Sequence, residues 1–331
     1  MGKALLIAAL VVLAVVVLVP LGAWLVLRAP DTTYEKLEAR YALPASRYVD
    51  LPGDVHLHYV DEGDRSRPTI VLLHGFGDSF LTWRPWAERL SRQYRVISLD
   101  LPGHGLTRAP KGYQASIDGY GRLVDAFAGK LDLPPFTLVG NSMGGGVAWR
   151  FAVDHPQRLD GLVLVDAAGW PKTGPAKAPP LAFRILQYPI GRAFLQSIDN
   201  RPLIVQGLKA DVYDKQLVTK SWVDGWAAVQ LAPGHRPILM SIRPGALAVA
   251  TPEVLAGIKR PTLVLQGEED HIIPAGSGQK FAQAIPGAQL IVYPKVGHLP
   301  QWEIPQRSAD DVAAFVQSRV VHGADGGGPS H

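Results

Sequence analysis

Residues 136–152 read FTLVGNSMGGGVAWRFA, and this stretch decides how the chain folds. An apolar run, Phe136 to Val139, is followed by a serine between glycines and then by a helix-like segment that begins at Gly145. The pattern predicts a strand, a sharp turn and a helix, with Ser142 at the turn. It matches the G-x-S-x-G motif, whose glycines leave room where strand and helix nearly touch.

Short apolar runs recur on both sides of this stretch and predict a sheet. Two early runs, 48–51 and 55–60, alternate apolar and polar residues, as an antiparallel pair at a sheet edge does. The later runs are continuously apolar and alternate with helical segments: 70–73, 94–99, 136–139, 162–165, 262–265 and 289–292. This arrangement predicts an α/β fold with a mostly parallel, eight-stranded sheet that helices cover on both faces.

The strand pattern disappears between about residues 170 and 250, where we expect a helical lid over the carboxyl edge of the sheet. This segment holds ten lysines or arginines against four aspartates, so it is markedly basic. One hypothesis is that it faces anionic lipid headgroups; the alternative is an ordinary basic surface. Its aromatic residues are expected mainly to pack, with one or two lining an acyl pocket: Trp170, Tyr188, Phe194, Trp222 and Trp226.

The amino-terminal segment predicts a membrane anchor over residues 1–30. Ala4 to Leu27 carries no charge and spans about 36 Å as a helix, enough to cross a hydrocarbon core of roughly 30 Å. The run is longer than the apolar part of a usual signal peptide, and no clear cleavage site ends it. Trp24 is expected at the membrane interface. Basic residues lie on both sides of the span, so charge assigns no side of the membrane.

The remaining organisation follows from these boundaries. The sheet domain is expected in two parts, 31–169 and 251–321, on either side of the lid at 170–250. Thr32 to Glu35 fits a capping box that opens a short helix ending near Tyr41. The Gly-rich end, 322–331, is expected to be disordered.

A serine hydroxyl becomes a nucleophile only with a base, and the base must be oriented. His298 lies in a loop directly after the last strand run, at the edge where catalytic groups gather in parallel sheets. Asp270 follows the preceding strand, which gives the chain order Ser142, Asp270, His298 that this motif requires. Asp166, after the strand that ends at Val165, is a rival for the acid.

Other polar residues near these motifs are expected to be structural. They comprise loop histidines (His74, His104, His271), a carboxylate that organises its own turn (Asp100) and carboxylates that are solvated, capping or paired (Glu268, Glu269, Glu303). The chain has no cysteine and no H-E-x-x-H motif, so neither a metal nor another cofactor is predicted. A net charge of +4 without a basic arm does not indicate a nucleic-acid partner.

From about residue 41 to 320 the chain resembles the α/β-hydrolase family. Besides the serine motif, the resemblance rests on H-G-F-G at 74–77, D-L-P-G-H-G at 100–105, G-x-x-D-x-x-x-P at 267–274 and the late Gly-His at 297–298. It implies that Ser142 attacks, that His298 carries the proton and that Asp270 holds the imidazole. It also implies an oxyanion hole formed by the backbone amides of Phe76 and Met143.

The nucleophile distinguishes between branches of this family. Epoxide hydrolases and haloalkane dehalogenases resemble the chain at 100–105, but they carry an aspartate where Ser142 stands. Serine implies acyl transfer. The motif at 140–145 is similar both to C–C hydrolases of aromatic degradation and to membrane-anchored monoacylglycerol lipases. The anchor favours a lipid-like ester as substrate and the membrane as partner. The alternatives are a C–C hydrolase for a diketone-type substrate and a hydrolase-fold binding protein with negligible turnover.

Overall fold

The computed structural model describes residues 2–171, 181–242 and 249–321. Its centre is one eight-stranded sheet in the order β1-β2-β4-β3-β5-β6-β7-β8. The pairs β1/β2 and β2/β4 are antiparallel, and all other neighbouring pairs are parallel. The predicted antiparallel edge and parallel centre are therefore confirmed. The strands are β1 Ser46–Leu51, β2 Val55–Glu62, β3 Thr69–Leu73, β4 Arg95–Leu99, β5 Phe136–Asn141, β6 Leu159–Val165, β7 Thr262–Gly267 and β8 Gln289–Tyr293.

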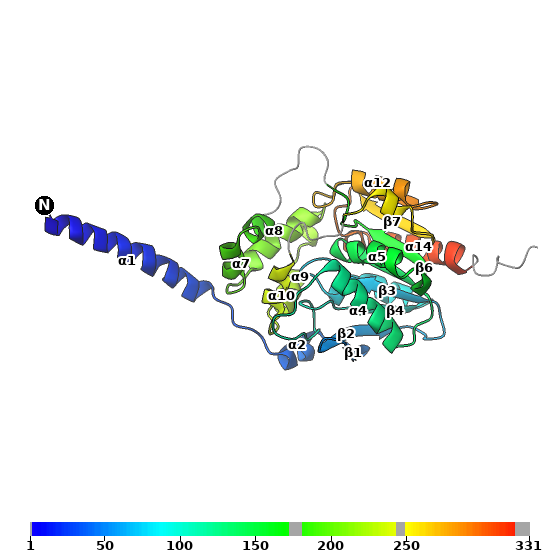
Figure 1. Ribbon diagram of the computed structural model, residues 1–331, viewed down its shortest axis with the longest axis horizontal. Coiled ribbons are helices and arrows are strands. Elements are labelled where there is room, and N and C mark those ends of the chain that lie inside the picture. The colour runs from blue at the N-terminus through cyan, green and yellow to red at the C-terminus, as the bar shows by residue number, and fades with distance from the viewer. Residues whose placement is uncertain (1, 172–180, 243–248, 322–331) are drawn as a thin grey trace, which may run out of the picture.

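Helices cover both faces of the sheet (Figure 1). On one face α4 (Ile117–Lys130), α5 (Met143–Asp154) and α12 (Gly276–Ala284) bury a large apolar cluster. On the other face α3 (Arg84–Leu90) and α14 (Pro305–Phe315) bury a second one. Both faces of the central strands are thus dry, which explains why their sequences are continuously apolar. Shorter helical segments are Phe80–Trp83, Pro156–Arg158, α11 Pro252–Leu255, α13 Pro300–Glu303 and a final π-type turn, Val316–Val321.

Among the described residues, the insertion at 170–250, which we call the lid, contains five helices. They are α6 Leu181–Leu186, α7 Pro189–Leu195, α8 Arg201–Asp211, α9 Lys220–Gln230 and α10 His235–Ser241, with a short turn at Lys215–Leu217. Two aromatic residues differ from the expectation that they pack, because Tyr188 and Phe194 are exposed. Three of the basic residues counted above, Lys172, Lys177 and Arg243, lie outside the described residues, as does the predicted disordered tail at 322–331.

The amino-terminal helix α1 (Gly2–Leu27) stands apart from the rest of the protein (Figure 1). Its stretch Leu5–Leu27 is the one helix among the described residues that is long and apolar enough to cross a membrane, a test that a signal sequence also passes. The next helix, α2 (Tyr34–Tyr41), ends where predicted, but the predicted capping box is wrong. Thr33 is the N-cap and its side chain accepts no capping hydrogen bond, so Glu35 stands one position too early for the reciprocal bond.

Candidate active site

Ser142 lies at the turn between β5 and α5, in a backbone conformation that few side chains adopt. Its φ is 54° and its ψ is −116°. A methyl group built on Gly140 would lie 2.1 Å from the carbonyl oxygen of Gly144, and one on Gly144 would lie 2.3 Å from that of Leu73. The two glycines are therefore required by contact between backbones, as the motif predicts. Strain of this kind costs about 1–3 kcal/mol and is typical of functional positions.

Asp270 and His298 come from the loops after β7 and β8 and form a buried pair. Nδ1 of His298 lies 2.6 Å from Oδ2 of Asp270. The other oxygen, Oδ1, accepts hydrogen bonds from the amides of Ile272 at 2.7 Å and Ile273 at 2.9 Å. These bonds fix the carboxylate, and the carboxylate in turn fixes the orientation of the imidazole.

The electrostatic surroundings favour a basic imidazole. Burial by itself lowers the pKa of His298, but the charge of Asp270 and its hydrogen bond outweigh burial and raise that pKa above its usual value. The ring is therefore a stronger base than a free histidine. It can accept a proton only in its neutral form, so its activity as a base depends on pH.

Asp166 lies beside this pair but is hydrogen-bonded elsewhere. Its Oδ1 accepts bonds from Nε2 of Gln266 at 2.6 Å and from the amide of Gly267 at 2.9 Å. Burial, followed by the charge of Asp270, raises the pKa of Asp166 well above its ordinary value. Asp270 is thus the carboxylate in contact with His298.

Asp166, Asp270 and His298 could together bind a metal ion. Among the described residues they are the one group of three or more His, Cys, Asp or Glu side chains whose potential metal-binding atoms all lie within 4.8 Å of one another. The arrangement fits a hydrogen-bonded cluster better than a metal centre. A cation would compete with the 2.6 Å contact between His298 and Asp270 and with the hydrogen bonds that Oδ1 of Asp166 accepts from Gln266 and Gly267.

Among the other polar residues that the sequence placed near these motifs, His74 and His104 have structural partners. In His74, Nε2 accepts the amide of Leu101 at 3.1 Å, so Nδ1 carries the proton and donates to the carbonyl of Gly75 at 2.8 Å. Nδ1 of His104 lies 3.2 Å from the carbonyl of Pro102. Burial lowers the pKa of both histidines. Glu268 and His271 are exposed, and Glu269 is half-buried.

Asp100 organises its loop as expected, and it also completes an arrangement that the sequence did not reveal. Its carboxylate accepts the amides of Phe80 at 2.7 Å and Leu106 at 2.8 Å. Its Oδ2 lies 2.7 Å from Nδ1 of His58, and Nε2 of His58 lies 2.8 Å from Oγ of Ser46. Ser46, His58 and Asp100 therefore form a second series of serine, histidine and aspartate side chains, linked by hydrogen bonds at the β1/β2 edge of the sheet.

Glu303 joins the loop of His298 to the lid. Its Oε1 accepts the amide of Gly297 at 2.8 Å, and its Oε2 accepts the amide of Tyr213 at 2.7 Å. In addition, the amide of His298 donates to the carbonyl of Asp211, at the end of α8, at 2.5 Å. The capping role expected for Glu303 is confirmed, and its consequence is that the lid is fastened directly to the loop that carries the imidazole.

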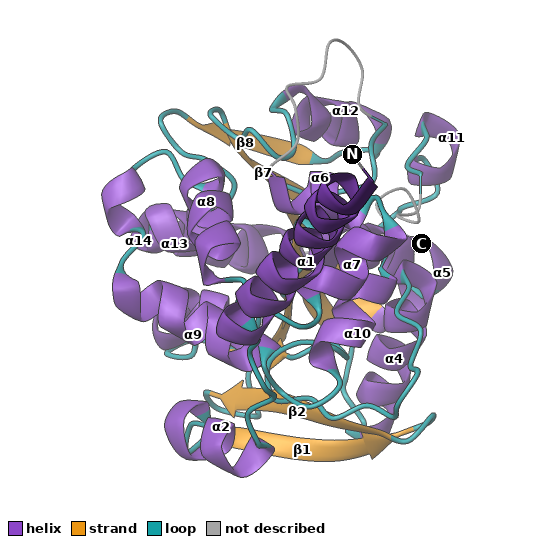
Figure 2. Cartoon of the chain, turned by 90° about the vertical axis from the view of Figure 1, so that its left-hand side faces the viewer, coloured by secondary structure: helices purple, strands orange, loops and turns teal. Residues whose placement is uncertain are grey.

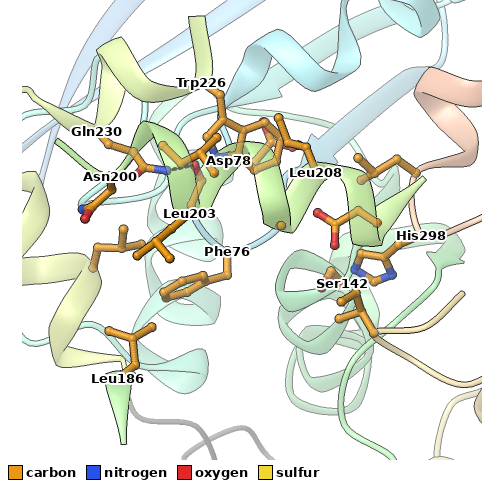
Figure 3. Close-up of a pocket in the computed structure, with 18 of the residues that line it drawn as sticks. Phe76, Asp78, Ser142, Leu186, Asn200, Leu203, Leu208, Trp226, Gln230 and His298 are labelled. Carbon is orange, nitrogen blue, oxygen red and sulfur yellow. Dashed lines mark hydrogen bonds between the residues drawn. The ribbon is translucent and has the colours of Figure 1, made fainter. Parts of the chain in front are cut away.

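Ser142 and His298 line the same cavity of about 140 Å³, and Figure 3 shows their side chains beside each other at one end of it. Phe76, Leu203 and Leu186 extend away from that end (Figure 3). The other apolar lining residues are Leu195, Ile204, Leu208, Leu239, Met240, Ile272 and Leu299. The polar ones besides Ser142 and His298 are Asp78, Asn141, Asn200, Asp211, Trp226 and Gln230. The described lining includes no lysine or arginine.

Two carboxyl groups of this lining were not found by sequence reasoning. Asp211, the last residue of α8, has a pKa raised to about 7 by burial, although the neighbouring His298 opposes that rise. Burial also raises the pKa of Asp78 well above its usual value. Asp211 belongs to no motif, and only the docking of α8 against the His298 loop brings it into the cavity, so the sequence carried no signal for it.

The chain is similar in sequence to known proteins. A protein-family sequence model described as "Alpha/beta hydrolase family" matches residues 70–315. A 2-hydroxy-6-oxononadienedioate/2-hydroxy-6-oxononatrienedioate hydrolase of Comamonas testosteroni is 31% identical over 265 residues, 75% of this chain and 86% of its own length. A pimeloyl-[acyl-carrier protein] methyl ester esterase of Nitrosomonas europaea is 27% identical over 263 residues, 76% of this chain and 96% of its own length.

Among solved structures, a membrane phospholipase A described as a bacterial virulence factor superposes with a TM-score of 0.70. It is 23% identical and covers 96% of this chain and 98% of its own. At this identity the likeness concerns the fold alone.

Proposed function

The chain belongs to the alpha/beta hydrolase family, and on that premise we propose that it is a membrane-anchored serine hydrolase that cleaves carboxylic esters. The proposed substrates are lipid-like esters with medium or long acyl chains, such as monoacylglycerols. The observation that carries the proposal is the shared cavity in which the strained Ser142 meets His298, itself held by Asp270 at 2.6 Å.

In the proposed mechanism Ser142 attacks the ester carbonyl carbon while Nε2 of His298 takes the hydroxyl proton. The imidazolium then gives that proton to the departing alcohol, which leaves an acyl group on Ser142. A water molecule, activated by the same imidazole, releases the acid and restores the serine. Asp270 keeps Nδ1 protonated throughout and stabilises the imidazolium.

The tetrahedral oxyanion is proposed to lie against the amides of Phe76 and Met143. Met143 is the first residue of α5, so its amide has no carbonyl one turn earlier in the helix to bond with. Phe76 follows β3, in a loop that faces the sharp turn at Ser142, which we call the elbow. This loop and the elbow meet at the end of the cavity that holds Ser142. Two such donors supply several kcal/mol of transition-state stabilisation, because removing one typically costs about 2.7–4 kcal/mol.

The charge of the cavity supports ester cleavage over C–C hydrolysis. The Comamonas relative is named for dioate substrates, which carry two carboxylates. Here the described lining contains the acids Asp78 and Asp211 and no lysine or arginine. Bringing a carboxylate into such a site costs several kcal/mol. A neutral ester with an apolar acyl chain fits the row of Phe76, Leu203 and Leu186.

The anchor proposal rests on α1. The large apolar side chains described along this helix are exposed, and none of the described residues of the span is buried. A bilayer would bury them, at about 25 cal/mol per Å² of apolar surface. Carbonate-resistant membrane association and detection of the intact amino terminus by mass spectrometry test this proposal. Recovery of a soluble protein that begins near residue 30 would instead identify a cleaved signal sequence.

The principal test compares Ser142→Ala with Ser46→Ala. We expect Ser142→Ala to abolish steady-state hydrolysis of p-nitrophenyl esters with folding preserved, and Ser46→Ala to keep most of the activity. Trapping of an acyl group on residue 142, detected by mass spectrometry, supports the nucleophile assignment. Equal loss of activity in both variants, or none in Ser142→Ala, contradicts it.

A substrate panel then separates the alternatives. Monoacylglycerols and p-nitrophenyl esters of graded chain length test the proposed activity, and a diketo acid tests C–C cleavage. Faster turnover of the diketo acid than of every ester would favour the C–C hydrolase. Binding without turnover across the panel would favour a hydrolase-fold binding protein.

A further inference from the structure

An apolar patch is exposed on the lid at α6 and α7. The described residues outside α1 include six large apolar side chains that are exposed, and four of them lie here: Leu181, Tyr188, Ile190 and Phe194. Ile190 is 83% exposed and Tyr188 63%. A cluster of this kind marks a binding surface for a protein or a membrane. We call these four residues the α6–α7 patch.

Basic side chains flank the α6–α7 patch. Arg184 lies on α6 and Arg192 on α7, and neither forms an ion pair with any described residue. The guanidinium of Arg192 instead donates to the carbonyl of Leu186 at 2.9 Å. Apolar side chains bordered by arginines match the boundary between lipid headgroups and acyl chains.

The end of α1 is attached to the lid just after α7, the helix that carries Ile190 and Phe194. The amide of Asp199 donates to the carbonyl of Leu27 at 2.8 Å, and the amide of Ala29 donates to the carbonyl of Ser197 at 3.0 Å. Nε1 of Trp24 also donates to Oγ of Ser197 at 3.1 Å. Because α7 ends at Leu195, only a few residues separate the patch from the end of the span. Figure 2 shows α1 in front of α6, α7 and α10.

The opposite side of the same two helices faces the cavity. Leu186, the last residue of α6, and Leu195, the last residue of α7, are buried and line the cavity that holds Ser142. One layer of short helices thus separates the α6–α7 patch from the site. A surface attached to the span and backed by an apolar cavity suits a substrate that arrives from the bilayer.

We infer that the α6–α7 patch is a second membrane contact, inserted in the bilayer that holds α1, and that lipid-like substrate passes beneath these helices to Ser142. The inference rests on the proposed membrane anchor. It adds that the lid itself contacts the bilayer, so that the protein is held there in one orientation. Residues 197 and 199 are hydrogen-bonded to the end of α1. These bonds hold the α6–α7 patch at the level of the membrane interface, where Trp24 is expected to lie.

The natural absence of cysteine allows a direct test in the full-length protein. Single variants Ile190→Cys, Val15→Cys and Val249→Cys are labelled with an environment-sensitive fluorophore and placed in phosphatidylcholine vesicles with nitroxide-bearing lipids. Val249 is a matched control because it is 59% exposed and lies outside α6 and α7. Quenching of the labels at 15 and 190, but not at 249, is the expected result.

The control positions separate the two proposals. A quenched label at 15 with an unquenched label at 190 overturns the lid contact and leaves the anchor intact. An unquenched label at 15 overturns the anchor itself. A label at 190 that responds to protein concentration rather than to quencher would show that a second copy of the chain covers the patch, which also overturns the inference.

A functional test uses Ile190→Asp with Val249→Asp as its control. We expect Ile190→Asp to slow hydrolysis of a long-chain ester embedded in vesicles by about tenfold, because a charge resists insertion. Hydrolysis of soluble p-nitrophenyl acetate should change less than about twofold, and Val249→Asp should leave both rates unchanged. Equal loss on both substrates in Ile190→Asp would indicate a folding defect and contradict the inference. If the wild-type protein cleaves neither ester, the proposed function fails, whereas the quenching result still stands.

Discussion

The protein contains two sets of serine, histidine and aspartate, which we call the first and the second chain, and their surroundings differ. Ser142, His298 and Asp270 meet at the carboxyl edge of the sheet, whereas Ser46, His58 and Asp100 meet at its antiparallel edge. The histidine–aspartate contacts are almost equal, 2.6 Å and 2.7 Å. A histidine–aspartate hydrogen bond close to a serine is therefore not by itself an indication of catalysis.

What distinguishes the first chain is its access and its backbone. Ser142 and His298 line a cavity, and Ser46 and His58 do not line it. Ser142 has a positive φ at the start of a helix, whereas Ser46 is the first residue of a regular strand and its hydroxyl accepts the amide of Leu43 at 2.9 Å. The second chain thus fastens the edge of the sheet, and the first has room for a substrate.

The largest contrast is expected between Asp270→Asn and Asp100→Asn. Loss of Asp270 removes the group that orients His298, so we expect kcat to fall by about 10³–10⁴ while the melting temperature changes little. Asp100→Asn breaks a buried charged network and is expected to cost about 3 kcal/mol of stability. The measurements are ester kinetics and thermal unfolding in detergent. A loss of kcat without loss of stability in Asp100→Asn would give the second chain a catalytic role.

The strained elbow belongs only to the first chain, and Gly144→Ala tests its cost. The added methyl group would meet the carbonyl of Leu73 at 2.3 Å, so we expect stability to fall by about 3 kcal/mol, with activity lost as well. Gly121→Ala in α4 is the control, because its methyl group meets nothing within 4 Å and should stabilise the helix by up to about 1 kcal/mol. An unchanged melting temperature in Gly144→Ala would contradict the contact argument.

The lid adds a titrating group to the first chain, and Asp211→Asn should reveal it in the pH profile. The charge of ionised Asp211 favours the imidazolium form of His298, so it raises the pKa of that ring. Removing the charge lowers the pKa of His298. Because the neutral ring is the active base, the acid limb of kcat/KM should move to lower pH, by up to about one unit. A shift to higher pH would show that the two groups are not coupled in this way.

The smallest effect is expected for Asp166→Asn. Burial, followed by the charge of Asp270, raises the pKa of Asp166 well above its ordinary value and so favours its neutral form, which asparagine matches in shape and charge. We expect kcat at pH 7 to stay within about threefold of the wild type. A loss comparable to that of Asp270→Asn would show that the negative charge next to His298 is shared between the two residues.

Sequence reasoning succeeded where the signal is local. The elbow could be predicted because close backbone contact demands glycine within two residues of Ser142. The strands could be predicted because dry strands are continuously apolar. Asp166 and Asp270 both follow strands that end at the same edge, so sequence could nominate both but could not establish which contacts His298. The capping box failed because the helix begins one residue later than its spacing requires.

By itself, the sequence determined the mostly parallel sheet, the sharp turn at Ser142 and the candidates for base and acid, because periodicity and steric contact act between near neighbours. Only the tertiary structure decided which carboxylate touches His298, that Asp211 enters the cavity and that Ser46, His58 and Asp100 form a second chain. It alone also decided that the end of α1 bonds to the segment of the lid that follows α7. These contacts join residues far apart in the chain, and the packing of whole elements, rather than any local pattern, sets their distances.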